Sequence, residues 1–237
     1  MKLAMWSGPR NLSTAMMYAF ASRPDFSAVD EPFYAAYLNL TGLQHPMRDQ
    51  ILQAQPQDPY QVVDSLLGPN PDGCQNVYHK HMTQHMIEAI PRDWMLKVTN
   101  VFLIRHPARV VASFAKKYPD PKTEDIGFHQ QADLFRYLVE NGQNPIVINT
   151  ADIRSNPEQK LRELCGALGL AFDAKMLKWT KGGQSCDGVW GPHWYGAVHN
   201  STGFDDAEGP LPILSGRLLE LVGQSLEPYE ELAQFSL

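Results

Sequence analysis

The sequence has few charged residues and no excess of basic ones. Its 20 lysines and arginines face 26 aspartates and glutamates, so the formal net charge is -6, and only 19% of the residues are charged. Binding along a nucleic acid depends on a broad positive surface, which this balance excludes, so no nucleic-acid partner is expected. Any bound polyanion must therefore meet a small local cluster of cations.

Cysteine is also scarce, and its pattern excludes two kinds of site. The three cysteines are Cys74, Cys165 and Cys186. They are odd in number, widely spaced and free of a CxxC pair, so neither a disulfide framework nor a zinc site is indicated. We expect three reduced thiols with structural roles.

Long apolar runs are absent as well. No stretch approaches the ~20 apolar residues that cross a bilayer, and the first residues lack the apolar run of a signal peptide. We therefore expect a cytoplasmic protein without a membrane partner. The length of 237 residues suits one domain, 1–237, with the oligomeric state left open and a homodimer among the alternatives.

Short apolar runs alternate with amphipathic stretches along the chain. The predicted strands are residues 2–6, 27–29, 76–81, 100–104 and 145–148. The predicted helices are residues 13–22, 46–53, 60–67, the stretch after Pro107, 125–141, 157–168 and 212–235. Because strands that alternate with helices form parallel sheets with right-handed crossovers, the sequence predicts a three-layer α/β/α fold with a mainly parallel sheet. Residues 33–72 and 179–209 are predicted to be an insert and a loop outside this framework.

The connection between the first strand and the first helix has the chemistry of an anion site. Backbone N–H groups and the helix dipole converge on residues 7–14, where Arg10 adds a cation and Ser13 and Thr14 add hydroxyl groups. The lysine of the Walker A signature GxxxxGK[ST] is missing, which disfavours kinase chemistry with magnesium. Taken alone, the loop is equally compatible with a plain helix cap.

A second anion motif follows the clearest strand. Arg105 comes at the end of that strand, Pro107 begins the next helix, and Ser113 lies two helical turns further on. Such a pair can hold one phosphate from two sides, because the guanidinium gives bidentate hydrogen bonds and the hydroxyl gives one more.

Together the two motifs resemble the sulfotransferase superfamily that uses 3′-phosphoadenosine 5′-phosphosulfate (PAPS). In that family a loop of the type PKSGTTW or PRSGST binds the 5′-phosphosulfate, and the pattern R-x-P-x-x-x-x-x-S binds the 3′-phosphate. Here Leu12 stands at the usual glycine and Arg10 at the lysine of the cytosolic enzymes. The resemblance assigns PAPS binding to Arg10, Asn11, Leu12, Ser13, Thr14, Arg105, Ser113 and Lys181, the last within a K-G-G segment similar to one that closes over the nucleotide.

Further segments narrow the resemblance to one branch. They are similar to bacterial sulfotransferase-like proteins and to plant proteins whose names mention branched-chain aminotransferase. These segments are Asp30 to Tyr34, Tyr78 to Met82, Asp187 to Trp190 through Trp194 and Tyr195, and Ser201 to Phe204. This implies the P-loop nucleotide hydrolase fold without nucleotide hydrolysis. It implies nothing about the acceptor, and no pyridoxal-phosphate site is indicated.

The resemblance also orders the candidates for catalysis. Sulfuryl transfer needs an in-line acceptor, stabilisation of charge and a base for the acceptor proton, and side chains can neutralise the donor without a metal. Arg10 is the candidate for the bridging oxygen, Glu31 is the favoured base, Lys80 stabilises charge and His81 is the third candidate. His79, His81 and His85 lack a tight zinc spacing, so no metal is predicted.

The predicted function is therefore transfer of a sulfuryl group from PAPS to a hydroxyl or amine of a small-molecule acceptor. Residues 33–72 and 179–209 would then lie on the acceptor side. Two alternatives stay open at this point, an atypical P-loop kinase and a non-catalytic nucleotide-binding or interaction protein.

Overall fold

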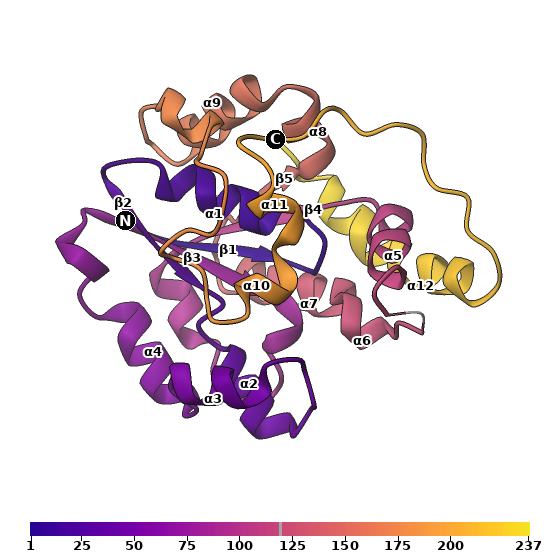
Figure 1. Ribbon diagram of the computed structural model, residues 1–237, viewed down its shortest axis with the longest axis horizontal. Coiled ribbons are helices and arrows are strands. Elements are labelled where there is room, and N and C mark those ends of the chain that lie inside the picture. Colours follow the sequence, from indigo (N-terminus) through magenta and orange to yellow (C-terminus); the bar gives the residue numbers. More distant parts are fainter. Residues whose placement is uncertain (119) are drawn as a thin grey trace.

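The structure, a computed structural model, describes residues 1–118 and 120–237. Its centre is a five-stranded sheet in which every neighbouring pair is parallel, in the order β2-β3-β1-β4-β5. The strands are β1 (Lys2–Ser7), β2 (Phe26–Asp30), β3 (Asn76–Met82), β4 (Thr99–Ile104) and β5 (Ile146–Asn149). Figure 1 shows their connections, and each predicted strand is confirmed with small changes at its ends.

Helices surround the sheet. They are α1 (Ser13–Ala21), α2 (Tyr34–Thr41), α3 (Arg48–Ala54), α4 (Pro59–Leu67), α5 (Pro107–Ala115), α6 (Thr123–Ile126), α7 (Phe128–Glu140), α8 (Thr150–Ser155), α9 (Pro157–Ala167), α10 (Gly191–Trp194), α11 (Gly196–His199) and α12 (Gly216–Ala233). Short 3-10 turns lie at Pro71–Gly73, Thr83–His85, Asp93–Lys97 and Ala174–Leu177. Within the described residues, no helix has both the length and the apolar content that crossing a bilayer needs.

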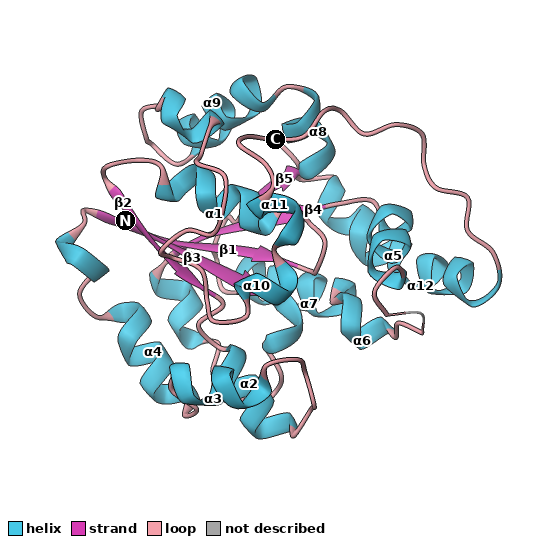
Figure 2. Ribbon diagram, in the orientation of Figure 1, coloured by secondary structure: helices cyan, strands magenta, loops and turns pink. Residues whose placement is uncertain are grey.

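The sheet is covered on both faces, as Figure 2 shows. One apolar cluster joins α1 and α9 to one face, and a second joins α4, α7 and the end of α12 to the other. The central strands are buried along nearly their whole length, which explains why their sequences are apolar runs and not alternating patterns. The predicted three-layer α/β/α fold with a parallel sheet is confirmed.

Some helices differ from the prediction for local reasons. The predicted helix 125–141 is two helices, because Gly127 has φ 72° and ends α6 before α7 begins. Helix α8 was not predicted; the side chain of Asn149 starts it by accepting a hydrogen bond from the backbone N–H of Ala151 at 3.0 Å. The last helix begins at Gly216, four residues later than predicted.

The strand order creates a crevice between β1 and β4. The connection from β1 runs through α1 on one face, and the connection from β4 runs through α7 on the other, so the two chain directions part above these neighbouring strands. Ligands of open α/β sheets bind at the carboxyl ends of the strands at such a point. Both predicted anion motifs begin there.

Candidate functional site

A cavity of about 490 Å³ opens at the carboxyl ends of the strands. This volume is in the range of small-molecule sites. The predicted site residues that line it are Arg10, Asn11, Leu12, Ser13, Thr14, Glu31, Lys80, Arg105 and Ser113. The fold therefore brings two motifs about 100 positions apart, and the carboxylate and lysine of two other strands, to one place.

The first anion loop has an unusual backbone. Arg10 and Leu12 both have φ 60°, the left-handed region that non-glycine residues seldom adopt. The Asn11 amide holds the loop against β4 by donating to the carbonyl of Leu103 at 2.7 Å. Helix α1 then begins without a side-chain cap, so its first N–H groups are available to an anion.

A close approach explains the glycine in this loop. A Cβ atom on Gly8 would lie 2.5 Å from the carbonyl oxygen of Ile126, a separation that real Cβ atoms do not show. The loop therefore packs directly against the end of α6. This contact and the Asn11 bond fix the loop from two sides.

The two anion motifs contact each other. Arg10 Nε donates to Ser113 Oγ at 2.9 Å, and Arg105 Nη1 donates to the carbonyl oxygen of Arg10 at 2.6 Å. Burial and the neighbouring charge of Arg105 lower the pKa of Arg10 from its usual value. Two guanidinium groups that repel each other at a cavity wall are a favourable environment for an anion.

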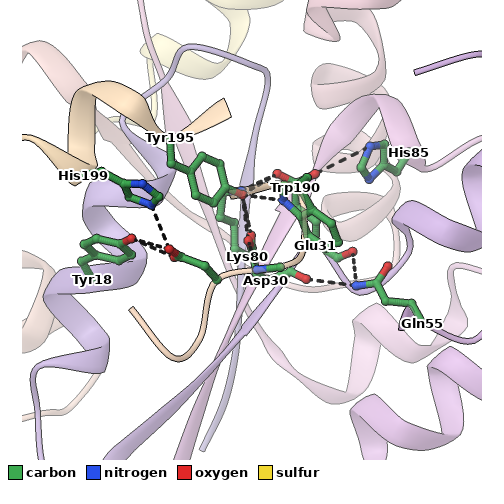
Figure 3. Close-up of polar contacts among 11 residues, drawn as sticks. Tyr18, Asp30, Glu31, Gln55, Lys80, His85, Trp190, Tyr195 and His199 are labelled. Carbon is green, nitrogen blue, oxygen red and sulfur yellow. Dashed lines mark hydrogen bonds and ion pairs between the residues drawn. The ribbon is translucent and has the colours of Figure 1, made fainter. Parts of the chain in front are cut away.

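A buried polar network lies at the ends of β2 and β3 (Figure 3). Parallel pairing sets Asp30 beside Lys80, whose Nζ donates to Asp30 Oδ1 at 2.9 Å and also to Glu31 Oε1. Lys80 donates further to the hydroxyl of Tyr195 at 2.7 Å, and Trp190 Nε1 donates to the same oxygen at 2.8 Å. The hydroxyl in turn lies 2.8 Å from Asp30 Oδ2.

The charges of this network fix the protonation states of Lys80 and Tyr195. Burial alone lowers the pKa of Lys80, but the carboxylates of Asp30 and Glu31 outweigh burial and the pKa is raised. Burial and the same two carboxylates raise the pKa of Tyr195 well above its usual value. Lys80 is therefore a cation and Tyr195 a neutral donor, fixed on one side of Glu31.

His81 does not reach the cavity. Successive side chains of β3 point to opposite faces, so His81 lies on the face away from Lys80, where its ring stacks on Trp6 at 4.4 Å between centroids. It is buried, and burial and the neighbouring His79 and His85 lower its pKa well below the usual value. His81 is therefore not among the residues that line the cavity.

The other end of the cavity is aromatic. His85 stacks between Tyr34 and Tyr37 with centroids 4.6 and 4.8 Å away, and its Nε2 lies 3.9 Å from Glu31 Oε2. Burial, His45 and Lys80 lower the pKa of His85 well below its usual value, so the ring is neutral. Among the described residues, no group of three or more His, Cys, Asp or Glu side chains is placed to hold a metal ion.

Segment 184–199, although far from β2 in the sequence, is tied closely to it. The backbone N–H of Gly188 donates to Asp30 Oδ2 at 3.0 Å, and Asp187 accepts from Tyr18 on α1 at 2.8 Å and lies 2.9 Å from His199 Nε2. The roles of Asp30, Asp187 and Tyr195 were not predicted from the sequence. A run of Asp, Trp and Tyr in a loop was the available signal, but it did not reveal which strand the loop contacts.

Lys181 lies apart from the other predicted donor residues. It is exposed and is not among the residues that line the cavity. Arg105, in contrast, has an unpredicted neighbour, because its Nε donates to Glu208 Oε1 at 2.8 Å.

Two curated relatives match most of this chain. Branched-chain-amino-acid aminotransferase-like proteins 1 and 2 of Arabidopsis thaliana are 38% identical over 200 residues and 35% identical over 219 residues. The matches cover 84% and 91% of this chain but only 36% and 39% of the relatives. The chain therefore spans little more than a third of the plant proteins it resembles.

Solved structures share the fold at low sequence identity. The sulfotransferase domain of the Synechococcus PCC 7002 olefin synthase has a TM-score of 0.53 at 14% identity and covers 94% of this chain and 93% of its own. A sulfotransferase from Alicyclobacillus acidocaldarius has a TM-score of 0.54 at 12% identity, with 100% and 96% covered. The sulfotransferase domain family matches residues 1–231. The chain thus belongs to the sulfotransferase domain family.

Proposed function

We propose that this protein transfers a sulfuryl group from PAPS to a hydroxyl or amine of a small-molecule acceptor. The observation that carries the proposal is that both anion motifs and the Glu31 carboxylate line a single cavity. Donor, reacting group and acceptor can then meet in one place, as group transfer requires.

The donor half of the cavity supplies positive charge and N–H groups. Arg10, the start of α1 and the hydroxyls of Ser13 and Thr14 are assigned to the 5′-phosphosulfate. Arg105 and Ser113 are assigned to the 3′-phosphate. The Arg10–Ser113 hydrogen bond and the Arg105 bond to the Arg10 carbonyl support a joint role, because a ligand held by either motif would contact the other. These donors would stabilise charge that develops on the leaving phosphate.

The acceptor half supplies a base. In the transfer step the acceptor oxygen or nitrogen forms a bond to sulfur, the bond from sulfur to the 5′-phosphate oxygen breaks, and the acceptor proton passes to Glu31. The product is a sulfated acceptor and 3′-phosphoadenosine 5′-phosphate. Lys80 and Tyr195 occupy Oε1 of Glu31, which leaves Oε2, the oxygen nearer His85, for the proton.

The test is ligand selectivity in thermal unfolding and calorimetric titration. The ligands are 3′-phosphoadenosine 5′-phosphate, AMP, and ATP with magnesium. A ligand at about 100 times its Kd stabilises the folded state by about 2.7 kcal/mol. We expect stabilisation by the 3′,5′-bisphosphate and loss of this effect in Arg105→Ala. We expect no loss in Lys116→Ala, which removes an exposed charge just after α5.

Other outcomes identify the alternatives. A preference for ATP with magnesium would contradict sulfuryl transfer and favour an atypical kinase. Selective binding of the bisphosphate without turnover of PAPS, assayed by mass spectrometry on a panel of phenols, alcohols and amines, would favour a non-catalytic nucleotide-binding protein.

A further inference from the structure

A cluster of three arginines lies beside the donor half of the cavity. Arg105 follows β4, Arg109 lies on α5 and Arg154 lies on α8, and all three contact the carboxylate of Glu208. Glu208 belongs to the irregular connection between α11 and α12, the orange-to-yellow segment that in Figure 1 runs along the outside of the molecule towards α12.

The contacts to Glu208 are close and come from three directions. Arg105 Nε donates to Oε1 at 2.8 Å, and Arg154 Nη1 donates to the same oxygen at 3.2 Å. Arg109 Nε lies 2.8 Å from Oε2. The side chain of Glu208 is 3% exposed, whereas those of the arginines are 17–20% exposed. A carboxylate from a surface segment has thus been placed inside a cationic pocket.

Little else holds this segment. Within the described part of the chain, residues 205–213 make no backbone–backbone hydrogen bond to another segment. Their other polar contacts go to the same arginines, since Arg154 Nε donates to the carbonyl of Asp206 at 2.9 Å and Arg109 donates to that of Gly209. The segment is therefore held mainly by the arginine cluster, with Glu208 as its anchor.

Glu208 balances the positive charge of the three arginines only in part. Three guanidinium charges meet one carboxylate in direct contact, and the next nearest, Asp205, lies 3.9 Å from Arg154. A carboxylate offers two oxygens and one charge, whereas a phosphate monoester offers three acceptor oxygens and up to two charges. The pocket is better matched to a phosphate than to the side chain it holds.

We propose that Arg105, Arg109 and Arg154 form the pocket for the 3′-phosphate of the donor, and that Glu208 occupies this pocket as an internal competitor which leaves when the donor binds. The inference rests on the proposed function, because it presupposes a donor with a 3′-phosphate. Arg105 and Arg154 line the cavity, so a nucleotide inside it reaches the cluster directly.

The competition has a specific consequence for affinity. A ligand with a 3′-phosphate must displace Glu208, so its apparent affinity is the intrinsic affinity multiplied by the fraction of molecules in which the pocket is free of the carboxylate. A ligand without that phosphate leaves Glu208 in place and is unaffected. The segment therefore adjusts the donor concentration at which the site is half-saturated, independently of the contacts to the 5′-phosphosulfate.

The experiment is a calorimetric titration of the full chain with 3′-phosphoadenosine 5′-phosphate and, separately, with AMP. Glu208→Gln keeps the shape of the side chain and removes its charge. Asp206→Asn is the matched control, because it removes a charge from the same segment while only the backbone of Asp206 contacts an arginine. We expect Glu208→Gln to bind the bisphosphate about tenfold more tightly, since hydrogen bonds between charged groups are lost from the competitor. Asp206→Asn and all AMP titrations should change less than about threefold.

Arg154→Gln provides an independent test. It should weaken bisphosphate binding about tenfold and AMP binding much less, and in the double variant with Glu208→Gln the gain from Glu208→Gln should shrink. Equal bisphosphate affinity in the wild type and Glu208→Gln would overturn the inference, as would an equal gain for AMP. Failure of the proposed function itself looks different, because then neither the wild type nor Glu208→Gln prefers the bisphosphate to AMP.

Discussion

The two ends of the cavity are built from charged residues in opposite ways. At the acceptor end, the buried Lys80 donates hydrogen bonds to two carboxylates and to the hydroxyl of Tyr195, and the indole N–H of Trp190 donates to the same hydroxyl. At the donor end, Arg105, Arg109 and Arg154 share the single carboxylate of Glu208, and the guanidinium groups of Arg10 and Arg105 repel each other.

The difference indicates which end of the cavity already has its final geometry in the free protein. A buried network with all partners present needs no ligand and holds its geometry, which is what a catalytic base requires. A partly exposed cluster of cations with too few anionic partners is stabilised when an anion binds to it. We infer that the acceptor end is preorganised, whereas the donor end is completed by its ligand.

The substitution expected to disrupt the buried network of the acceptor end most strongly is Lys80→Met. It leaves Asp30 and Glu31 buried together without their cation, and removing one partner of a buried ion pair costs about 3–5 kcal/mol. We expect the free energy of unfolding in urea to fall by about that amount. Lys97→Met, at an exposed position, should change it by less than about 0.5 kcal/mol. A loss below about 1 kcal/mol for Lys80→Met would mean that the network is solvated and not preorganised.

Glu31→Gln separates catalysis from donor binding. Because Glu31 is the proposed base, turnover should fall about 10²–10⁴-fold, the usual contribution of general base catalysis. Bisphosphate affinity should stay within about threefold, because the donor contacts lie at the other end. Glu88→Gln, an exposed control, should leave both unchanged. Normal turnover in Glu31→Gln would remove this residue as the base and leave His85 as the nearest alternative.

The framework of the fold was predictable from sequence because it depends on local patterns. The run Val101 to Ile104 is apolar, β-branched and aromatic, and a strand covered on both faces needs such residues. The break at Gly127 was missed because a helix pattern on both sides of one glycine does not reveal its sign of φ.

The site was predictable only where a motif carries its own geometry. Arg10 and Arg105 follow the ends of neighbouring strands, Ser113 lies on the helix after the second of them, and the strand order brings the three together. The face of a strand residue, in contrast, depends on its register. His81 and Lys80 are neighbours in sequence but lie on opposite faces, and the pairing of β3 with β1 sets His81 beside Trp6. Tyr195 and Glu208 belong to irregular segments whose partners no periodicity indicates.

The pH dependence of stability tests the burial of His79 within the sheet. Burial lowers the pKa of His79 to about 3, against about 6.5 for a free histidine. Below about pH 6.5 His79 is protonated in the unfolded chain but stays neutral in the folded chain. Folding stability is therefore lost as the pH falls from there towards 3. His79→Gln should reduce the slope of unfolding free energy against pH by up to about 1.4 kcal/mol per unit between about pH 6 and 4.

The matched control for this slope is His129→Gln, at an exposed position. The comparison uses slopes and not absolute stabilities, so a general loss of packing in His79→Gln does not affect it. An unchanged slope in His79→Gln would show that the acid response comes from other groups, with the buried His81 and His85 the next candidates.

The smallest expected effect concerns Lys181, which the resemblance assigns to the donor. Lys181 is not among the residues that line the cavity, and the N–H of the next residue, Gly182, donates to the carbonyl of His199 at 2.8 Å. Lys181→Ala should therefore change bisphosphate affinity less than about twofold, in contrast to Arg105→Ala. A tenfold loss would show that this segment closes over the bound nucleotide. The donor end would then be completed by a movement of the chain as well as by its ligand, and its contrast with the preorganised acceptor end would be larger than the free protein shows.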